Sequence, residues 1–299
     1  MKRHYKITAV LVAGFAASLM LFHDPILAQA PAPAPAPAPA GNQDTSRFHF
    51  GGFIKSTDPR VQNRTYHFAD TNEDLPYCVF VSSKVSKEKK NPLIISLHGL
   101  GIGPGYMCQG KAIDLAEEGG YILAAPMGYN VGGWYGSPVM DLSRRAARPG
   151  APVFPPPPPN LAELSEKDVF NVLDMMRKEF NVDPDRTYLM GHSMGGAGTL
   201  FLGSKHASDW AAIAAIAPAD FLMNNNREEI LKGITEPVLV VQGDADMQVP
   251  VTNTRMWIDT MKELKLDYVY KEFPGATHIT VIEQAMPDIF AFFNAHTKK

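Results

Sequence analysis

Four polar residues in the second half of the chain have the types and the order needed to cleave an acyl bond. Ser193 lies in the stretch GHSMG, and Asp244, Asp246 and His278 follow it. A serine hydroxyl becomes a nucleophile when a histidine takes its proton and a carboxylate orients that histidine. The order of serine, acid and histidine therefore indicates a reaction that passes through an acyl-serine.

Glycines flank Ser193 for a steric reason. A G-x-S-x-G stretch between a strand and a helix puts the serine on a strained turn, where side chains two residues away on either side would collide. Gly191 and Gly195 remove that collision, and the helix that follows directs its free N–H groups toward the site. The alternative, a glycine-rich helix start with an idle serine, is disfavoured because an apolar run precedes GHSMG and a helical pattern follows it.

Asp246 is the expected acid. It lies three residues beyond Gly243, the end of the run PVLVVQG, and just before MQVP, so its carboxylate can reach past the end of a strand. Asp244 is the alternative, and we expect its side chain to bind the backbone of the turn instead.

His278 is the expected base. It occurs in GATH, directly after the last strand-like run, DYVYKEF, which puts it above the same sheet edge as Ser193. His206 and His296 are the other downstream histidines. His206 is at the far end of the helix that Ser193 opens, and His296 lies in the C-terminal tail, so neither is expected to act as the base.

Two backbone N–H groups are expected to bind the negative oxygen that forms during such a reaction. The stretch LHGLG turns tightly after a buried run and presents the N–H of Leu100, while Met194, next to the serine, presents the other. In this interpretation His98 organises its loop and His192 packs against the sheet. The chemistry requires no metal and no cofactor.

Eight short apolar or β-rich runs alternate with helical patterns after about residue 47. The runs are RTYHFA, LPYCVFVSS, NPLIISLHG, YILAAPMG, RTYLMG, WAAIAAIAPA, EPVLVVQG and DYVYKEF. The first two suggest an antiparallel pair, and the continuous apolar runs are typical of strands buried on both faces. We therefore expect an α/β fold with a mostly parallel sheet and helices on both faces.

The clearest helical pattern is SEKDVFNVLDMMRKEF. Ser165 and Asp168 resemble a capping box at its start, and Asn181 and Pro184 are expected to end it. Its apolar residues recur on one face of a helix: Val169, Val172, Leu173, Met176 and Phe180.

The N-terminal segment is predicted to direct export. Lys2, Arg3 and Lys6 precede an apolar core, and small residues follow, which is typical of a secretory signal peptide with cleavage after Ala28. An uncleaved membrane anchor is the alternative, but the apolar core is short for a span. We expect a signal peptide at 1–28, a Pro/Ala-rich leader at 29–46 and one catalytic domain at 47–299. The mature protein would be secreted or periplasmic, with no stable membrane span.

Composition limits the partners and the cysteine chemistry. The chain has 299 residues and a net charge of −3, which argues against nucleic acid because phosphate binding needs a basic face. It has two cysteines, Cys78 and Cys108. Export would permit a disulfide, but Cys78 lies in a strand-like run, so we expect a buried free thiol there.

Two loops have open roles. The proline-rich segment 144–160 is either a surface insertion or a part of the rim of the site, since it follows the end of a strand. In the stretch GYNVGGWYGSP, Trp134 and Tyr135 either line the substrate pocket or pack the loop onto the core.

The stretches LHGLG, RTYLMGHSMGGAGTL, QGDADMQVP and GATH together resemble the α/β-hydrolase superfamily. Over roughly residues 60–297 the chain is similar to a secreted esterase branch that includes polyhydroxybutyrate depolymerase-like, feruloyl and acetylxylan esterase-like and prolyl-oligopeptidase-like proteins. That branch often has histidine where this chain has Gln242.

The resemblance implies a serine hydrolase that cleaves small-molecule or polymer esters. A serine peptidase acting on short peptides is the second hypothesis, because the motifs do not separate esters from amides. A binding protein that has the fold without the activity is the third, and the complete order of serine, acid and histidine counts against it.

Overall fold

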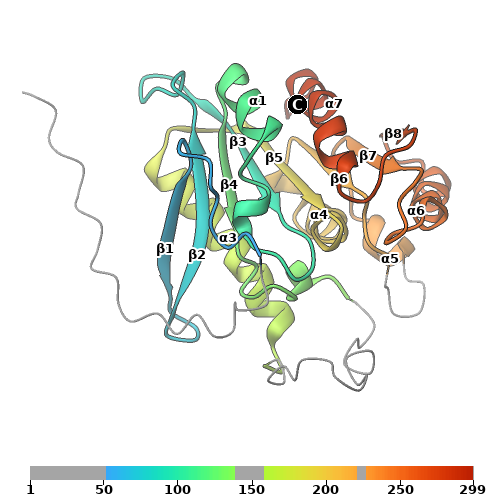
Figure 1. Cartoon of the computed structure of the whole chain (residues 1–299), viewed down its shortest axis with the longest axis horizontal. Helices are drawn as coiled ribbons and strands as arrows, with labels where there is room; N and C mark the ends of the chain where they lie inside the picture. The colour runs from blue at the N-terminus through green and yellow to red at the C-terminus, as the bar shows by residue number, and fades with distance from the viewer. Residues whose placement is uncertain (1–51, 139–157, 221–226, 299) are drawn as a thin grey trace, which may run out of the picture. The chain divides into compact units, whose positions relative to one another are not determined.

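The computed structural model describes residues 52–138, 158–220 and 227–298, and within them one eight-stranded sheet organises the chain (Figure 1). Along the sheet the strands run in the order β1-β2-β4-β3-β5-β6-β7-β8. Their bounds are β1 Gln62–Phe68, β2 Glu73–Val81, β3 Asn91–Leu97, β4 Ile122–Pro126, β5 Val182–His192, β6 Ala212–Ile216, β7 Val238–Gly243 and β8 Tyr268–Phe273. All eight runs expected to be strands are strands.

The sheet is antiparallel at one end and parallel elsewhere. β1 pairs antiparallel with β2, and β2 pairs antiparallel with β4. From β4 through β3, β5, β6 and β7 to β8 every pairing is parallel. Because parallel strands end at the same edge of a sheet, the loops after β3, β5, β7 and β8 meet there.

Helices cover both faces of the sheet, which confirms the predicted fold class. The helices are α1 Lys111–Gly119, α3 Leu161–Glu179, α4 Met194–Lys205, α5 Arg227–Leu231, α6 Val251–Glu263 and α7 Thr280–Ala295, with short 3-10 turns η2 Pro104–Tyr106, η3 Trp134–Gly136 and η4 Ala207–Asp209. One apolar core lies between the sheet and α3, α4, α5 and α6, and a second lies beneath α1 and α7 (Figure 1). Side chains alternate between them along a strand, so Leu93 and Ile95 enter the first core and Ile94 the second.

Helix α3 begins four residues earlier than the sequence pattern predicted. It starts at Leu161, with Asn160 at the N-cap position, so Ser165 and Asp168 are buried inside the helix. Their side chains bind the loop that follows β4: the Ser165 hydroxyl donates to the carbonyl of Gly128 (2.7 Å), and Asp168 Oδ2 accepts from the N–H of Tyr129 (3.0 Å). The capping-box interpretation is therefore wrong, because these side chains form hydrogen bonds with the backbone of a loop and not with the N-terminal N–H groups of the helix.

The two cysteines form a disulfide, so the expectation of a buried free thiol at Cys78 is wrong. Cys78 on β2 and Cys108, just after η2, have Cα atoms 6.6 Å apart and are joined through their sulfurs. The segment after β3 folds back over β2, which brings together two residues that are 30 positions apart in sequence.

Loss of this disulfide is expected to destabilise the fold. The Cys78→Ala/Cys108→Ala double variant should lose about 3 to 4 kcal/mol of unfolding free energy, because the closed loop of roughly 30 residues becomes free in the unfolded chain. Urea unfolding of the oxidised protein, the thiol-reduced protein and the double variant measures the effect. Reduced protein and double variant should agree, and a double variant as stable as the oxidised protein would contradict the expectation.

Glu236 is a buried acid at the amino end of β7, opposite the edge where the strand-end loops meet. Its Oε2 accepts from the N–H of Thr235 (3.0 Å), whereas its Oε1 has no hydrogen-bond partner among the described residues. Burial raises the pKa of Glu236 to about 7. In the unfolded chain the pKa returns to the ordinary value near 4.5, so folding favours the protonated acid.

Glu236 should therefore make stability depend on pH. As pH rises from about 4.5 to about 7 the unfolded state releases a proton that the folded state retains, so unfolding free energy falls and then levels off. Glu236→Gln should remove this dependence and gain about 2 to 3 kcal/mol at pH 8, with little change at pH 4.5. Urea unfolding across this range measures it, with Glu263→Gln, an exposed acid, as the control. An equal pH dependence in wild type and Glu236→Gln would contradict the assignment.

Several sequence predictions concern segments outside the described residues. The signal peptide at 1–28, the leader at 29–46 and residues 144–157 of the proline-rich segment belong to this group. Among the residues that the structure describes, no helix is both long enough and apolar enough to cross a membrane.

Candidate active site

Ser193 forms the tight connection between β5 and α4. Its backbone has φ 60° and ψ −114°, a left-handed conformation that is strained for a residue with a side chain. A Cβ atom at Gly191 would lie 2.2 Å from the carbonyl oxygen of Gly195, and one at Gly195 would lie 2.2 Å from that of Leu97. The steric reason expected for the two glycines is confirmed.

Backbone hydrogen bonds hold this turn independently of the serine hydroxyl. The N–H of Ser193 donates to the carbonyl of Ile216 at the end of β6 (2.9 Å), and the carbonyl of Ser193 accepts from the N–H of Ala219 (3.0 Å). The position of Ser193 is therefore set by the neighbouring strand, and the side chain is left for other interactions.

Asp246 presents an ionised carboxylate surrounded by donors. Oδ1 accepts from the N–H groups of Gln248 and Val249 (both 2.8 Å), and Oδ2 accepts from Nε2 of Gln242 (3.0 Å) and Nδ1 of His278 (2.7 Å). Burial alone would raise the pKa of Asp246, but the hydrogen bonds from His278 and the backbone outweigh it, so the pKa is lowered. The acid is thus charged and fixed in direction.

The acid that contacts His278 is Asp246 and not Asp244. The exposed Asp244 side chain accepts a hydrogen bond from the N–H of Gly275 (2.6 Å), which is the backbone contact expected for it. His206 instead contacts Glu166 (2.7 Å). His296 contacts the carbonyl of Phe292 (2.7 Å), so neither of these histidines joins Asp246.

His192 connects the Ser193 turn to the loop of His278, a contact that sequence reasoning missed. Their rings lie 4.5 Å apart, and Nε2 of His192 donates to the backbone carbonyl of His278 (2.8 Å). Burial, assisted by the nearby His278, lowers the pKa of His192 to about 3, so the ring is neutral. This bond holds the chain at His278 beside the residue that precedes Ser193.

The loop after β3 lies against the same turn. A Cβ atom at Gly99 would be 3.5 Å from Cβ of Ser193. The N–H groups of Leu100 and Met194 donate no hydrogen bond to the part of the chain that the structure describes. Leu100 directly follows Gly99, which lies against Ser193, and Met194 directly follows Ser193 itself.

The buried side chain of His98 organises this loop, as expected. Nε2 lies 2.8 Å from the carbonyl oxygen of Met127, and Nδ1 lies 2.9 Å from that of Gly99. Burial lowers the pKa of His98, so the ring is neutral and donates through one nitrogen. It joins the end of β3 to the end of β4.

Gln242 supports the acid from the position where the resembling esterases often have histidine. Its Nε2 donates to Asp246 Oδ2 (3.0 Å) and to the carbonyl of Val249 (2.9 Å), and its Oε1 accepts from the hydroxyl of Thr254 (2.7 Å). The side chain is fully buried. An amide does not titrate, so it donates to the acid at every pH.

Trp134 and Tyr135 lie in the buried part of their loop. Tyr135 has no exposed surface, and Trp134 is 5% exposed. Tyr135 therefore packs the loop onto the core, the second of the two alternatives for this pair. A contact between the edge of Trp134 and a substrate stays a prediction.

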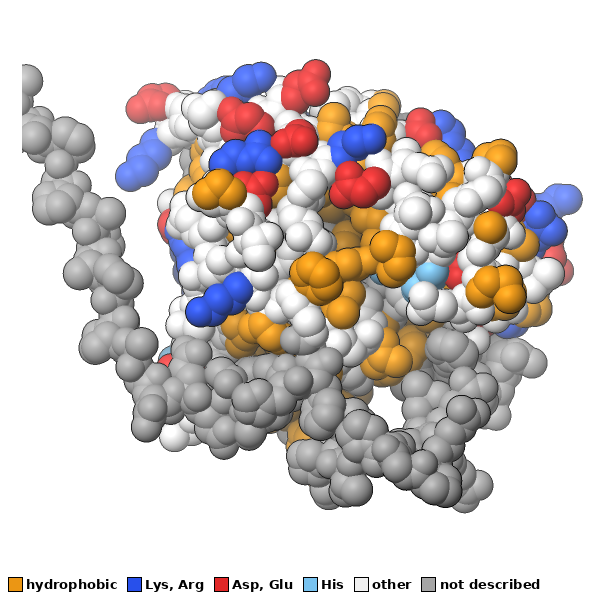
Figure 2. Space-filling model, in the orientation of Figure 1, with side chains coloured by type: hydrophobic (Ala, Val, Ile, Leu, Met, Phe, Trp, Pro, Cys, Tyr) orange, Lys and Arg blue, Asp and Glu red, His pale blue; other side chains and the backbone are white. Residues whose placement is uncertain are grey.

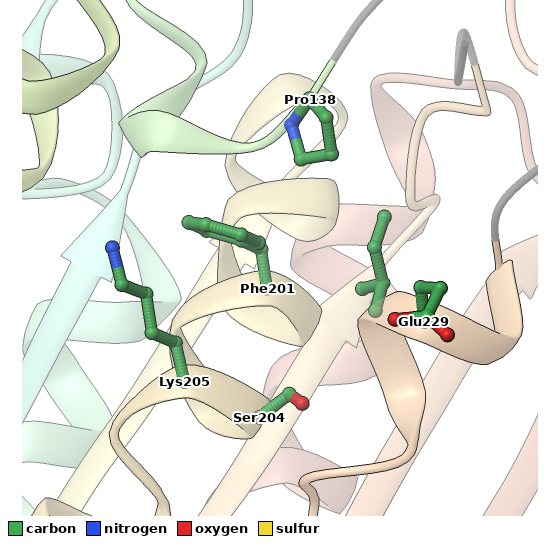
Figure 3. Close-up of a pocket in the computed structure, with 6 residues that line it drawn as sticks. Pro138, Phe201, Ser204, Lys205 and Glu229 are labelled. Atoms are coloured by element: carbon green, nitrogen blue, oxygen red, sulfur yellow. The ribbon is translucent and has the colours of Figure 1, made fainter.

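A surface hollow of roughly 290 Å³ is separate from these groups (Figure 3). Figure 3 shows Phe201 below Pro138 and Ser204 on the side of α4 that faces Glu229 of α5. The lining residues are Pro138, Phe201, Ser204, Lys205, Glu229 and Ile230. Phe201 is two helical turns beyond Ser193, about 12 Å along the axis, so this hollow is not part of the candidate site.

Exposed apolar side chains border the candidate site. Leu100 (50% exposed), Met247 (90%) and Ile279 (52%) each lie at or directly beside one of the residues described above. Phe53 (48% exposed) packs against the ring of Tyr106, and that ring contacts His192. Figure 2 shows hydrophobic side chains gathered near a histidine in the middle of one face. The exposed surface beside these residues is therefore rich in apolar side chains.

A family model of esterases matches residues 69–278, which include every element of this site. The chain belongs to the Esterase family. The resemblance to α/β-hydrolase esterases is thereby confirmed, and ester hydrolysis is the activity class of this family.

Curated relatives are similar over parts of the chain. The bifunctional acetylxylan esterase/xylanase XynS20E of Neocallimastix patriciarum is 30% identical over 42% of this chain and 15% of its own length. Cutinase 1 of Thermobifida cellulosilytica is 34% identical over 32% of this chain and 34% of its own length. Acyl-protein thioesterase 1 of Neurospora crassa is 26% identical over 64% of this chain and 81% of its own. The chain thus spans 15% and 34% of the length of the first two relatives.

Solved structures share the fold. An S-formylglutathione hydrolase from Agrobacterium tumefaciens has a TM-score of 0.62 and 15% identity, and covers 80% of this chain and 95% of its own. A ferulic acid esterase from Anaeromyces mucronatus has a TM-score of 0.56 and 19% identity, and covers 81% and 92%. The sheet described above is thus an α/β-hydrolase fold.

Proposed function

We propose that this protein is a serine carboxylic-ester hydrolase with Ser193 as nucleophile, His278 as base and Asp246 as acid. The observation that carries the proposal is the 2.7 Å hydrogen bond between His278 Nδ1 and Asp246 Oδ2, with His278 held beside the Ser193 turn through His192. Nδ1 carries the proton in that bond, because the lowered pKa of Asp246 keeps the carboxylate ionised. Nε2 of His278 is then free to take the serine proton.

The reaction follows in two steps. Ser193 Oγ attacks the acyl carbon as its proton moves to His278 Nε2, and the C–O bond to the alcohol breaks as that proton passes to the leaving oxygen. Water then attacks the acyl-serine as one of its protons moves to His278, and that proton passes to Ser193 Oγ as the acyl–oxygen bond breaks and the acid leaves. The N–H groups of Leu100 and Met194 stabilise the negative oxygen in both steps.

The exposed apolar side chains beside the site support esters with an apolar acyl or alcohol group, aromatic groups included, as substrates. Leu100, Met247 and Ile279 offer surface to an apolar acyl or alcohol group, which gains about 25 cal/mol for each Å² buried. Feruloyl and acetyl esters are named among the proteins similar to this chain, and both groups fit this description.

A substrate panel tests this function against the peptidase alternative. Aryl acetate, butyrate and octanoate, methyl ferulate, acetylated xylan, polyhydroxybutyrate and a peptide anilide are compared by kcat/KM. The esters should lead, with the anilide below them, because an amide also requires protonation of a poor leaving amine. An anilide turned over as fast as the best ester would overturn the esterase proposal.

We also propose that the domain acts outside the cytoplasm, after removal of residues 1–28. The disulfide between Cys78 and Cys108 supports this proposal, because such bonds persist in oxidising compartments. N-terminal sequencing of the protein recovered from the periplasm or medium tests it. A mature chain should begin at Gln29, and a chain that retains Met1 in the membrane fraction would contradict it.

A further inference from the structure

The hydroxyl of Tyr135 contacts both backbone polar groups of His98. The N–H of His98 donates to Tyr135 Oη (2.9 Å), and the Tyr135 hydroxyl donates to the carbonyl oxygen of His98 (3.2 Å). A phenol has one proton and accepts through its lone pairs, so both bonds form at once. His98 is the first residue after β3 and lies two positions before Leu100.

The ring of Tyr135 is locked from several directions. The backbone N–H of Tyr135 donates to the Ser165 hydroxyl (3.0 Å), and that hydroxyl donates to the carbonyl of Gly128. A Cβ atom at Gly198 of α4 would lie 2.7 Å from the ring, and one at Gly128 would lie 2.5 Å from it. The ring therefore fills the space between its loop and the helix that Ser193 opens.

The backbone at this ring is strained. Trp134 and Tyr135 are consecutive residues with φ of 56° and 54°, the left-handed region. Such conformations cost about 1 to 2 kcal/mol for each residue and persist where the surroundings impose them. The contacts of Tyr135 with Ser165 and His98 are the interactions that hold it in this conformation.

The loop 98–101 has a second attachment to the same segment. The N–H of Gly101 donates to the carbonyl of Val131 (2.8 Å), so residues 98 and 101 are both bound to the segment 128–138, one on each side of Leu100. The side chain of Leu100 is half exposed and does not anchor the loop. The direction of the Leu100 N–H therefore depends on the bonds at His98 and Gly101.

We propose that Tyr135 is a positioning residue: its hydroxyl fixes the backbone at His98 so that the N–H of Leu100 is already directed at the oxygen that becomes negative on the substrate. The inference rests on the proposed function of Ser193 and Leu100. Donors that are fixed in advance stabilise a developing charge without reorganisation during the reaction. Tyr135 acts on the reaction through the loop and has no exposed surface with which to contact a substrate.

Tyr135→Phe tests the proposal, because it removes one oxygen and keeps the ring. With an aryl butyrate, kcat should fall about 10- to 100-fold while KM changes less than about threefold. The inhibition constant of a trifluoromethyl ketone, which forms a tetrahedral adduct with an active serine, should rise by the same factor as kcat/KM falls. Tyr188→Phe is the matched control, since this buried hydroxyl donates to the carbonyl of His296 (2.7 Å) and is not part of the site. Tyr188→Phe should leave kcat, KM and the inhibition constant of the ketone unchanged.

Unchanged kcat in a folded Tyr135→Phe protein, or a lower kcat with unchanged binding of the ketone, would overturn the inference. If Tyr135→Phe does not fold, Ser165→Ala takes its place, because this change removes the hydrogen bond to the N–H of Tyr135. Ser165→Ala should raise the inhibition constant of the ketone and lower kcat/KM by the same factor. Unequal effects on the two would again overturn the inference. Failure of this inference is distinguishable from failure of the proposed function, because only the latter would leave the Ser193→Ala variant active.

Discussion

Ser193→Ala is expected to lower kcat for an aryl butyrate by about a million-fold, because the variant loses the nucleophile and with it the covalent route. The fold should survive. Alanine tolerates φ 60° no worse than serine does, and the bonds to Ile216 and Ala219 use the backbone of residue 193. Steady-state kinetics and urea unfolding of the same preparation measure the two effects.

Ser204→Ala is the matched control for this variant. Ser204 lies near the other end of α4, and its hydroxyl accepts from the N–H of Gly233 (3.0 Å). Its loss should cost on the order of 1 kcal/mol of stability and leave kcat unchanged. A Ser193→Ala variant with more than a thousandth of wild-type turnover would exclude Ser193 as the nucleophile.

Asp246→Asn is expected to lower kcat by about four orders of magnitude. All four hydrogen bonds at this side chain are donated to it, and an asparagine has one oxygen to accept them. If that oxygen stays with the N–H groups of Gln248 and Val249, the amide NH₂ faces His278. The ring must then accept through Nδ1 and carry its proton on Nε2, the tautomer that cannot take the proton of Ser193.

Asp244→Asn separates this effect from a general loss of charge in the loop. Asp244 lies two residues away and is exposed, and its side chain accepts a hydrogen bond from the N–H of Gly275. Its variant should keep kcat within about threefold of wild type and lose at most about 1 kcal/mol of stability. A larger loss of kcat in Asp244→Asn than in Asp246→Asn would reverse the assignment of the acid.

The sheet was predictable from the sequence because each buried strand is a continuous apolar run between turn residues. NPLIISLHG and PVLVVQG became β3 and β7, and the loops that follow them carry His98 and Asp246 to the same edge. Because the strands are parallel, the loops that carry Ser193, Asp246 and His278 all lie at this edge of the sheet. The contact of Asp246 with His278 follows from that topology.

Other contacts between segments far apart in the chain could not be predicted. The bond from His192 to the carbonyl of His278 joins residues 86 positions apart, and Tyr135 meets His98 across 37 positions. Ser165 matched a local capping pattern, yet its hydroxyl donates a hydrogen bond to the carbonyl of Gly128 in the loop after β4. In each case the partner is decided by packing between elements, which a pattern within one element does not contain.

Ser193 should carry the acyl group during turnover, and acid quenching during hydrolysis of an aryl butyrate tests this expectation most directly. Trypsin releases residues 187–205 as one peptide, which also contains Ser204, so fragment ions are needed to locate the modification. We expect a peptide heavier by one butyryl group, with the group on Ser193, and no such peptide from Ser193→Ala. A butyryl group on another residue, or turnover without any acylated peptide, would contradict it.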